Sequence, residues 1–294
     1  MDRSFVSLLS DLQVVQYIKV ACLSLLIFET TITLDLEYRY IWSRKWSFVK
    51  ILYLYSRYST FIDTTIAVSE QLDLKFLSCN SKEVTTFITI FSGLGIALTE
   101  ILLMIRTYAI YNSSRRVLIA FIMLWLTIGG VNFWAVTNWS KSFNVSRIPV
   151  TEMGDHVKCF LGRTSNIGLV CYLSFFAGET IILIMTAIKA FFVWRFTRET
   201  KTKSANWVLS FYQDGIFFYF FLLPFTTLSI LAPLTFPGGL YLVADTPLRV
   251  MHTILTCRMV LRVRCAIEEK DDLAISSIKF GEPEGQSIGS AHTV

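Results

Sequence analysis

Long apolar runs recur along the chain, separated by short polar stretches. Residues 88–105, 117–136 and 217–234 read ITIFSGLGIALTEILLMI, VLIAFIMLWLTIGGVNFWAV and FFYFFLLPFTTLSILAPL. An α-helix needs about 20 apolar residues to cross the hydrocarbon core of a bilayer. Six clear runs and one weaker run therefore predict an all-α integral membrane protein, a bundle of seven transmembrane helices.

The length of the chain leaves room for little else. Its 294 residues are 53% hydrophobic, and the mean hydropathy of +0.54 is well above that of a soluble domain. We expect a short outer N-terminus over 1–13, a membrane domain over 14–265 and a disordered cytoplasmic tail over 266–294. The predicted helices are 14–34, 48–69, 84–105, 117–136, 167–194, 207–233 and 240–262. The last helix starts either near Leu240 or at Pro247, with Asp245 or Thr246 as its cap.

The distribution of Lys and Arg predicts the orientation. The first, third and fifth connections hold 11 basic residues in 39, whereas the N-terminus and the other connections hold 7 in 63. Connections rich in Lys and Arg stay in the cytoplasm. We therefore expect an outer N-terminus and a cytoplasmic C-terminus. We also expect the protein to reside in the plasma membrane.

Several residues of the predicted loops suggest covalent modification. Two sequons on the outer side make Asn138 and Asn144 candidates for glycosylation. Cys79 and Cys159 are also on this oxidising side, so we predict a disulfide between them, the alternative being two unpaired thiols. Cys265 follows two arginines below the last helix and is a candidate for palmitoylation.

The first inner loop alternates aromatic and basic residues. Between two membrane helices, Trp42, Lys45 and Trp46 suit an interfacial anchor, with rings at headgroup depth and the ammonium group near lipid phosphates. This interpretation is favoured over a nucleic-acid or other ligand site.

Ionisable residues within the predicted helices form a candidate polar core: Glu29, Arg57, Asp63, Glu100, Glu179 and Asp214. Such residues are costly in lipid and usually face the bundle interior. We expect Arg57 to pair with a carboxylate of another helix, with Glu29, Glu100 or Asp214 as candidates. The core either fixes the helices structurally, or changes its pairing during signalling or conducts protons.

The chain lacks the common catalytic and metal-binding motifs. It contains three His and no HExxH, no GxSxG and no phosphate-binding glycine loop. We therefore expect no enzyme activity, no metal and no cofactor. The sequence Arg106-Thr107-Tyr108 and the absence of Asn-Pro-x-x-Tyr from the last helix argue against an ordinary rhodopsin-class receptor.

The segment LDLEYRYIWSRKWSFVKILYLYSRY at 34–58 resembles the N-terminal signature of a family of basidiomycete fungal membrane proteins that carry a domain of unknown function. The resemblance rests on Asp35, Glu37, Trp42, Lys45, Trp46, Lys50, Arg57 and Tyr58. It implies seven helices with a short tail and no established activity.

These observations favour a receptor-like seven-helix surface protein. Its partners would be the lipid bilayer, an unknown ligand and a cytoplasmic signalling protein, with no nucleic acid. The alternative is a small transporter or proton-coupled channel that uses the intramembrane carboxylates.

Overall fold

The fold is a bundle of long helices. The computed structural model describes residues 3–71, 81–141, 144–148, 158–162, 167–200, 203–236, 240 and 243–280. Within these residues it contains seven α-helices: α1 (Arg3–Glu37), α2 (Phe48–Gln71), α3 (Ser81–Ile110), α4 (Arg115–Lys141), α5 (Gly168–Thr200), α6 (Lys203–Thr235) and α7 (Asp245–Phe280). A π-helical turn, η1 (Tyr38–Trp42), extends α1.

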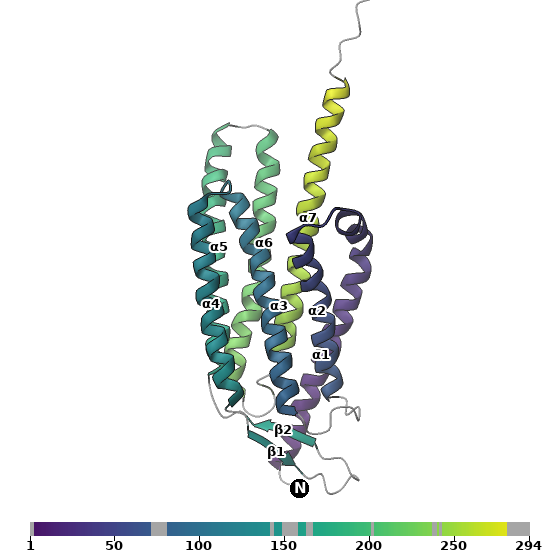
Figure 1. Cartoon of the computed structure of the whole chain (residues 1–294), viewed down its shortest axis with the longest axis vertical. Helices are drawn as coiled ribbons and strands as arrows, with labels where there is room; N and C mark the ends of the chain where they lie inside the picture. Colours follow the sequence, from purple (N-terminus) through teal and green to yellow (C-terminus); the bar gives the residue numbers. More distant parts are fainter. Residues whose placement is uncertain are drawn as a thin grey trace, which may run out of the picture.

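Successive helices run in opposite directions (Figure 1). The turns after α1 and α3 lie at the end of the bundle from which the C-terminal part of α7 projects. The start of α1 lies at the opposite end. There β1 (Asn144–Ile148) pairs antiparallel with β2 (Lys158–Gly162), so that Arg147 is opposite Cys159. The apolar patterning of the helices did not predict this hairpin.

Two helices form the centre of the bundle. Helix α7 packs against α1, α2, α3 and α6, and α3 packs against α2, α4, α5 and α7. The hydrophobic core between them includes the fully buried side chains of Tyr53, Leu103, Ile182 and Leu222. Between membrane helices, close packing of such side chains stabilises the bundle mainly through van der Waals contacts.

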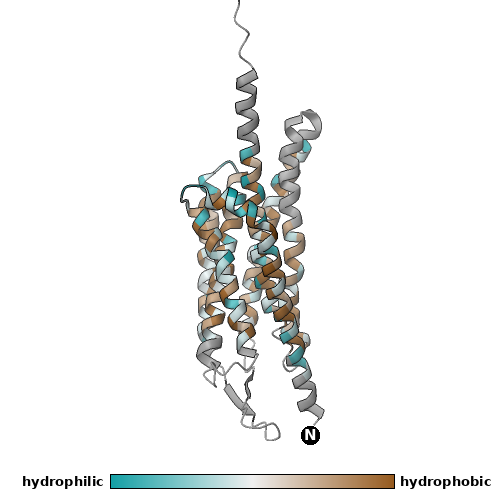
Figure 2. Cartoon of the chain, turned by 90° about the vertical axis from the view of Figure 1, so that its right-hand side faces the viewer, coloured by the Kyte–Doolittle hydropathy of each residue, from teal (hydrophilic) through white to brown (hydrophobic). Residues whose placement is uncertain are grey.

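Five segments of the described chain are long and apolar enough to cross a membrane: Gln13–Trp42, Thr86–Ile110, Arg115–Trp139, Gly168–Arg195 and Phe218–Thr235. Hydrophobic residues occur along the described helices over most of the bundle's length (Figure 2). Large apolar side chains such as Phe133, Ile119 and Phe192 are exposed on its surface. A lipid environment accounts for this surface, because soluble monomeric proteins rarely expose large apolar patches to water. The chain is an integral membrane protein with several membrane-spanning helices.

The C-terminal region differs from the sequence prediction. Helix α7 starts at Asp245, with Pro247 in its first turn, and remains helical to Phe280. Residues 266–280, expected to be disordered, therefore continue the helix. Glu and Lys are good helix formers, and Glu268 also forms an ion pair with Arg44 at 2.9 Å. Residues 281–294 lie outside the described part of the chain.

Candidate functional site: an ion-paired polar core

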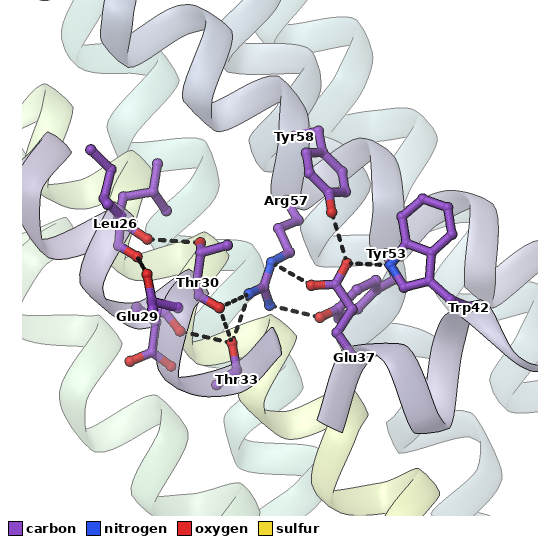
Figure 3. Close-up of polar contacts among 11 residues, drawn as sticks. Leu26, Glu29, Thr30, Thr33, Glu37, Trp42, Tyr53, Arg57 and Tyr58 are labelled. Atoms are coloured by element: carbon purple, nitrogen blue, oxygen red, sulfur yellow. Dashed lines mark hydrogen bonds and ion pairs between the residues drawn. The ribbon is translucent and has the colours of Figure 1, made fainter. Parts of the chain in front are cut away.

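Arg57 lies at the centre of a buried polar network between α1 and α2. Its Nε atom is 3.0 Å from Oε2 of Glu37, the last residue of α1. Its other two nitrogens donate to the Tyr53 hydroxyl at 2.7 Å, the Thr33 hydroxyl at 2.7 Å and the Thr30 carbonyl at 3.2 Å. Figure 3 shows the guanidinium group enclosed by these acceptors. The planar fork of Arg suits such a site, where a single ammonium group could not reach every acceptor.

The second oxygen of Glu37 is also occupied. The Trp42 indole donates to Oε1 at 3.2 Å and the Tyr58 hydroxyl donates to the same atom at 3.1 Å (Figure 3). The indole can reach back because η1 turns the chain directly after Glu37; the amide of Ser43 donates to the Tyr38 carbonyl at 3.1 Å. Glu37 is therefore fully buried although it sits at the end of a helix.

The sequence predicted that a carboxylate would pair with Arg57, but not which residue supplies it. A carboxylate of another helix does hold it, as expected, but this carboxylate is Glu37, neither Glu29 nor Glu100. The sequence prediction missed Glu37 because it ended the first helix at residue 34 and so placed Glu37 in a loop. Asp214 lies in α6, but its side chain is outside the described part of the structure.

A second buried ion pair joins α2 to α7. The Nε atom of Arg249 lies 2.9 Å from Oδ2 of Asp63, and both side chains are almost completely buried. Arg249 also donates to the hydroxyls of Ser59 at 2.8 Å and Thr253 at 3.3 Å. The guanidinium lies against Gly95 of α3, where a Cβ atom would be 2.0 Å from Nη2. The sequence prediction treated Arg57 as the only central base, so it missed Arg249.

A third set of polar residues joins α3, α5, α6 and α7. Glu179 accepts a hydrogen bond from Thr226 at 2.8 Å, and its other oxygen lies 2.8 Å from Nε2 of His252. Glu100 is 1% exposed, and neither of its oxygens has a hydrogen-bond partner among the described residues. Glu100 and Glu179 were predicted core residues, whereas His252 was not among the predicted residues of the polar core.

A fourth pair lies nearer the bundle surface. Arg258 of α7 donates from Nε and Nη2 to the two oxygens of Glu29 in α1, each at 2.5 Å. The Arg258 side chain is 46% exposed, whereas that of Glu29 is 8% exposed. The bidentate geometry adds directional specificity to this contact.

Helix α7 is therefore the common partner of three acidic residues from three other helices. Arg249 binds Asp63 of α2, His252 binds Glu179 of α5 and Arg258 binds Glu29 of α1. A sequence signal for this role exists: the weakest of the seven apolar runs contains the basic residues Arg249, His252 and Arg258, at intervals of three and six positions. An unpaired charge inside a membrane helix costs free energy, so each of these bases predicts an acidic partner.

The predicted interfacial anchor surrounds the end of α1. Trp42, Trp46 and Lys45 are exposed. Lys50 is buried; its ammonium lies 4.7 Å from the Trp46 ring centroid and donates to the carbonyls of Trp42 and Arg44. A shallow groove here is lined by Leu34, Asp35, Tyr38 and Trp42. Exposed rings beside basic groups suit a membrane interface.

The basic groups at this end also influence one another. Arg264 donates to the Tyr40 carbonyl at 3.5 Å. Partial burial, together with the positive charge of Arg44, lowers the pKa of Arg264. Its pKa nevertheless starts high enough for Arg264 to remain charged at neutral pH.

The candidate modification sites have different surroundings. Asn138 is in the last turn of α4, and its amide donates to the Trp134 carbonyl at 2.8 Å. Asn144 begins β1. Cys265 is half-buried, with Sγ 3.4 Å from the Tyr40 hydroxyl. Cys159 lies in β2, which contacts α3, whereas Cys79 is outside the described residues. The disulfide and the modifications remain predictions.

No metal centre was found in the described part of the chain, where no group of three His, Cys, Asp or Glu side chains could hold a metal ion. Among the described residues, the polar core instead contains acidic and basic groups that neutralise one another, with Glu100 as the exception. Such an arrangement can hold helices in a fixed relation, exchange partners or bind protons.

One family comparison finds a relative of the N-terminal part of this chain. The family described as "Family of unknown function (DUF6533)" matches residues 17–62. This segment includes Glu29, η1 and the whole network around Arg57. No curated protein matches the chain. The chain thus carries an N-terminal domain of unknown function that includes most of the paired helices α1 and α2.

Proposed function

We propose that this chain is a receptor-like seven-helix protein of the plasma membrane, in which the position of α7 carries the signal. Its N-terminus is outside and its C-terminus is in the cytoplasm. The resemblance to basidiomycete proteins extends the proposal to a fungal cell surface. An unknown ligand and a cytoplasmic signalling protein would be its partners, and the proposal assigns it no catalysis.

The observation that carries the proposal is the set of ion pairs on α7. Arg249, His252 and Arg258 contact three different helices. A ligand that broke one of these pairs would move α7. This movement would change the geometry of the other two pairs, because all three share one helix. Packed interfaces of this kind have discrete arrangements, so a small change at one end can be transmitted along the bundle.

The buried ion pairs of α2 and α7 also support seven membrane spans. Helices α2 and α7 are absent from the five segments selected by apolarity. Each carries two or more charged residues inside the bundle, and their partners are described: Arg57 with Glu37, and Asp63 with Arg249. Paired charges that face the interior are compatible with a membrane helix.

Distance measurements test the role of α7. Spin labels at Ala109 near the end of α3 and at exposed Ile267 of α7 would report their separation by double electron–electron resonance. Asp63→Asn weakens the pair with Arg249 far from these labels, and we expect it to shift or broaden the distance distribution. Asp35→Asn, an exposed acid on α1, is the control. An unchanged distribution in Asp63→Asn means that α7 does not transmit the change.

The alternative function is a proton-coupled transporter or channel. Buried Glu100 and Glu179 favour it, because intramembrane carboxylates occur in proton pathways. Proteoliposomes with an internal pH-sensitive dye separate the two functions. If the protein is a receptor, proteoliposomes under a pH gradient show the same proton flux as empty liposomes. A higher flux that Glu100→Gln abolishes would contradict the receptor proposal and support the transporter or channel.

A further inference from the structure

We propose that Glu100, Glu179 and His252 form one proton-binding site in the interior of the bundle, in which Glu100 carries a proton at neutral pH. The site is separate from the Arg57 network and does not depend on the receptor proposal. Its ligand is the proton itself, held by two carboxyl groups and one imidazole from α3, α5 and α7.

The state of Glu100 follows from its surroundings. Its side chain is 1% exposed, and its two oxygens have no hydrogen-bond donor among the described residues. An ionised carboxylate with no protein donor and no cation beside it is strongly disfavoured in such a buried environment. A protonated carboxyl group is neutral and avoids this cost.

The second carboxylate lies nearby and is well supplied with partners. Glu179 accepts from Thr226 and contacts Nε2 of His252 at 2.8 Å. The Oε1 atom of Glu100 lies over Gly178, the residue before Glu179, at 3.9 Å from the position a Cβ atom would take. A charge on Glu100 would therefore repel the charge on Glu179. Two neighbouring carboxyl groups in one buried site cannot easily both ionise.

His252 completes the site. It is fully buried, with one nitrogen on Glu179 and with Nδ1 lacking a partner among the described residues. A proton shared with Glu179 gives an imidazolium–carboxylate pair, and its loss from His252 would leave Glu179 charged. Because the three groups lie in one buried cluster, a proton on any one of them changes the charge that the other two face.

Among the described residues, no basic side chain forms an ion pair with Glu100. From α7, Arg249 lies at Gly95 and is committed to Asp63 of α2. Buried Tyr219 of α6 lies near both glutamates, and Arg106 of α3 lies near Tyr219. The described neighbour from α4 is apolar Ile128, which would contact a Cβ at Gly178.

Infrared spectroscopy of the full chain in lipid nanodiscs tests the site, because a protonated carboxyl group absorbs at higher frequency than a carboxylate. At pH 7 we expect a protonated-carboxyl band that is lost in Glu100→Gln and retained in Glu29→Gln, since Glu29 is ionised by its pair with Arg258. If Glu100→Gln keeps the full band, or the wild-type protein has none, the proposal is wrong.

A second variant tests whether the groups share protons. His252→Gln removes the base beside Glu179, so we expect Glu179 to take up a proton and a second carboxyl band to appear at pH 7. Thr253→Val, on the same helix, is the control. No new band in His252→Gln would show that the histidine is not part of the site.

The stability of Glu100→Gln provides a separate outcome. Gln matches a neutral Glu in shape, so its unfolding temperature should stay within about 4 °C of wild type, equivalent to about 1 kcal/mol. A severe loss of folding would mean that the carboxylate is ionised and paired, which contradicts the proposal. Neither result depends on whether the protein signals or transports.

Discussion

Arg57 of α2 contacts Glu37 at the end of α1 through an ion pair of 3.0 Å, with both side chains almost fully buried. Removing one member of a buried pair leaves the other uncompensated, at a cost of about 3–5 kcal/mol. We therefore expect Arg57→Leu and Glu37→Gln each to lower the free energy of unfolding by about this amount. Because both lose the same interaction, the double variant should lose less than the sum. Denaturant unfolding of all four proteins measures this coupling.

The matched control is Arg44→Leu, the same substitution at an arginine whose side chain is 53% exposed and whose partner is Glu268. Exposed pairs contribute about 0–1 kcal/mol, so little change is expected. Strictly additive losses at Arg57 and Glu37 would show that the two residues do not act as a pair.

Gly95 and Gly93 provide a second matched pair on α3. A Cβ at Gly95 would overlap the guanidinium of Arg249, whereas a Cβ at Gly93 meets nothing within 4 Å. We expect Gly95→Ala to displace Arg249 from Asp63 and to destabilise the protein by about 3 kcal/mol or more. Gly93→Ala should be neutral or stabilising by up to about 1 kcal/mol, because Ala favours a helix. Thermal unfolding distinguishes them, and equal effects would contradict the close approach of Arg249.

The oxidation state of the cysteines tests the predicted disulfide. Cys22, Cys171, Cys257 and Cys265 are free thiols among the described residues. With a Cys79–Cys159 bridge, the denatured protein should take up two more alkylating groups after reduction than before it, as read by intact mass. Six groups without reductant would exclude the bridge. Replacing Cys79 by Ser should leave Cys159 reactive.

The orientation is tested by an epitope tag at the C-terminus. The excess of basic residues in the first, third and fifth connections predicts a cytoplasmic tail. The tag should be detected only after permeabilisation of the cells, with an N-terminal tag as the positive control on intact cells. Staining of the C-terminal tag on intact cells would reverse the predicted topology.

The helical fold could be predicted from the sequence because membrane helices produce long apolar runs. The runs located all seven helices, including α2 and α7, whose charges weaken the signal. Their ends were less predictable: α7 continues to Phe280 through polar residues that still favour a helix. The β1–β2 hairpin was missed since its strands are only five residues long and lie in a polar connection.

The polar core was predictable in composition but not in pairing. Glu29, Arg57, Asp63, Glu100 and Glu179 are buried as expected. Which acid meets which base depends on how the helices are packed, and periodicity along one helix does not reveal its neighbour. Glu37 illustrates the difficulty. It is buried at the end of a helix because a π-helical turn follows it and Trp42 folds back onto it.

The sharing of α7 among three acidic partners has a consequence for biosynthesis. Glu29, Asp63 and Glu179 are all synthesised before the basic residues that neutralise them, and in the proposed seven-span topology those basic residues enter the membrane after the acids. Until then the nascent helices carry unmatched acids that lipid does not accommodate. The first six helices should therefore remain beside the translocon or a chaperone, and completion of α7 should release them as an assembled bundle.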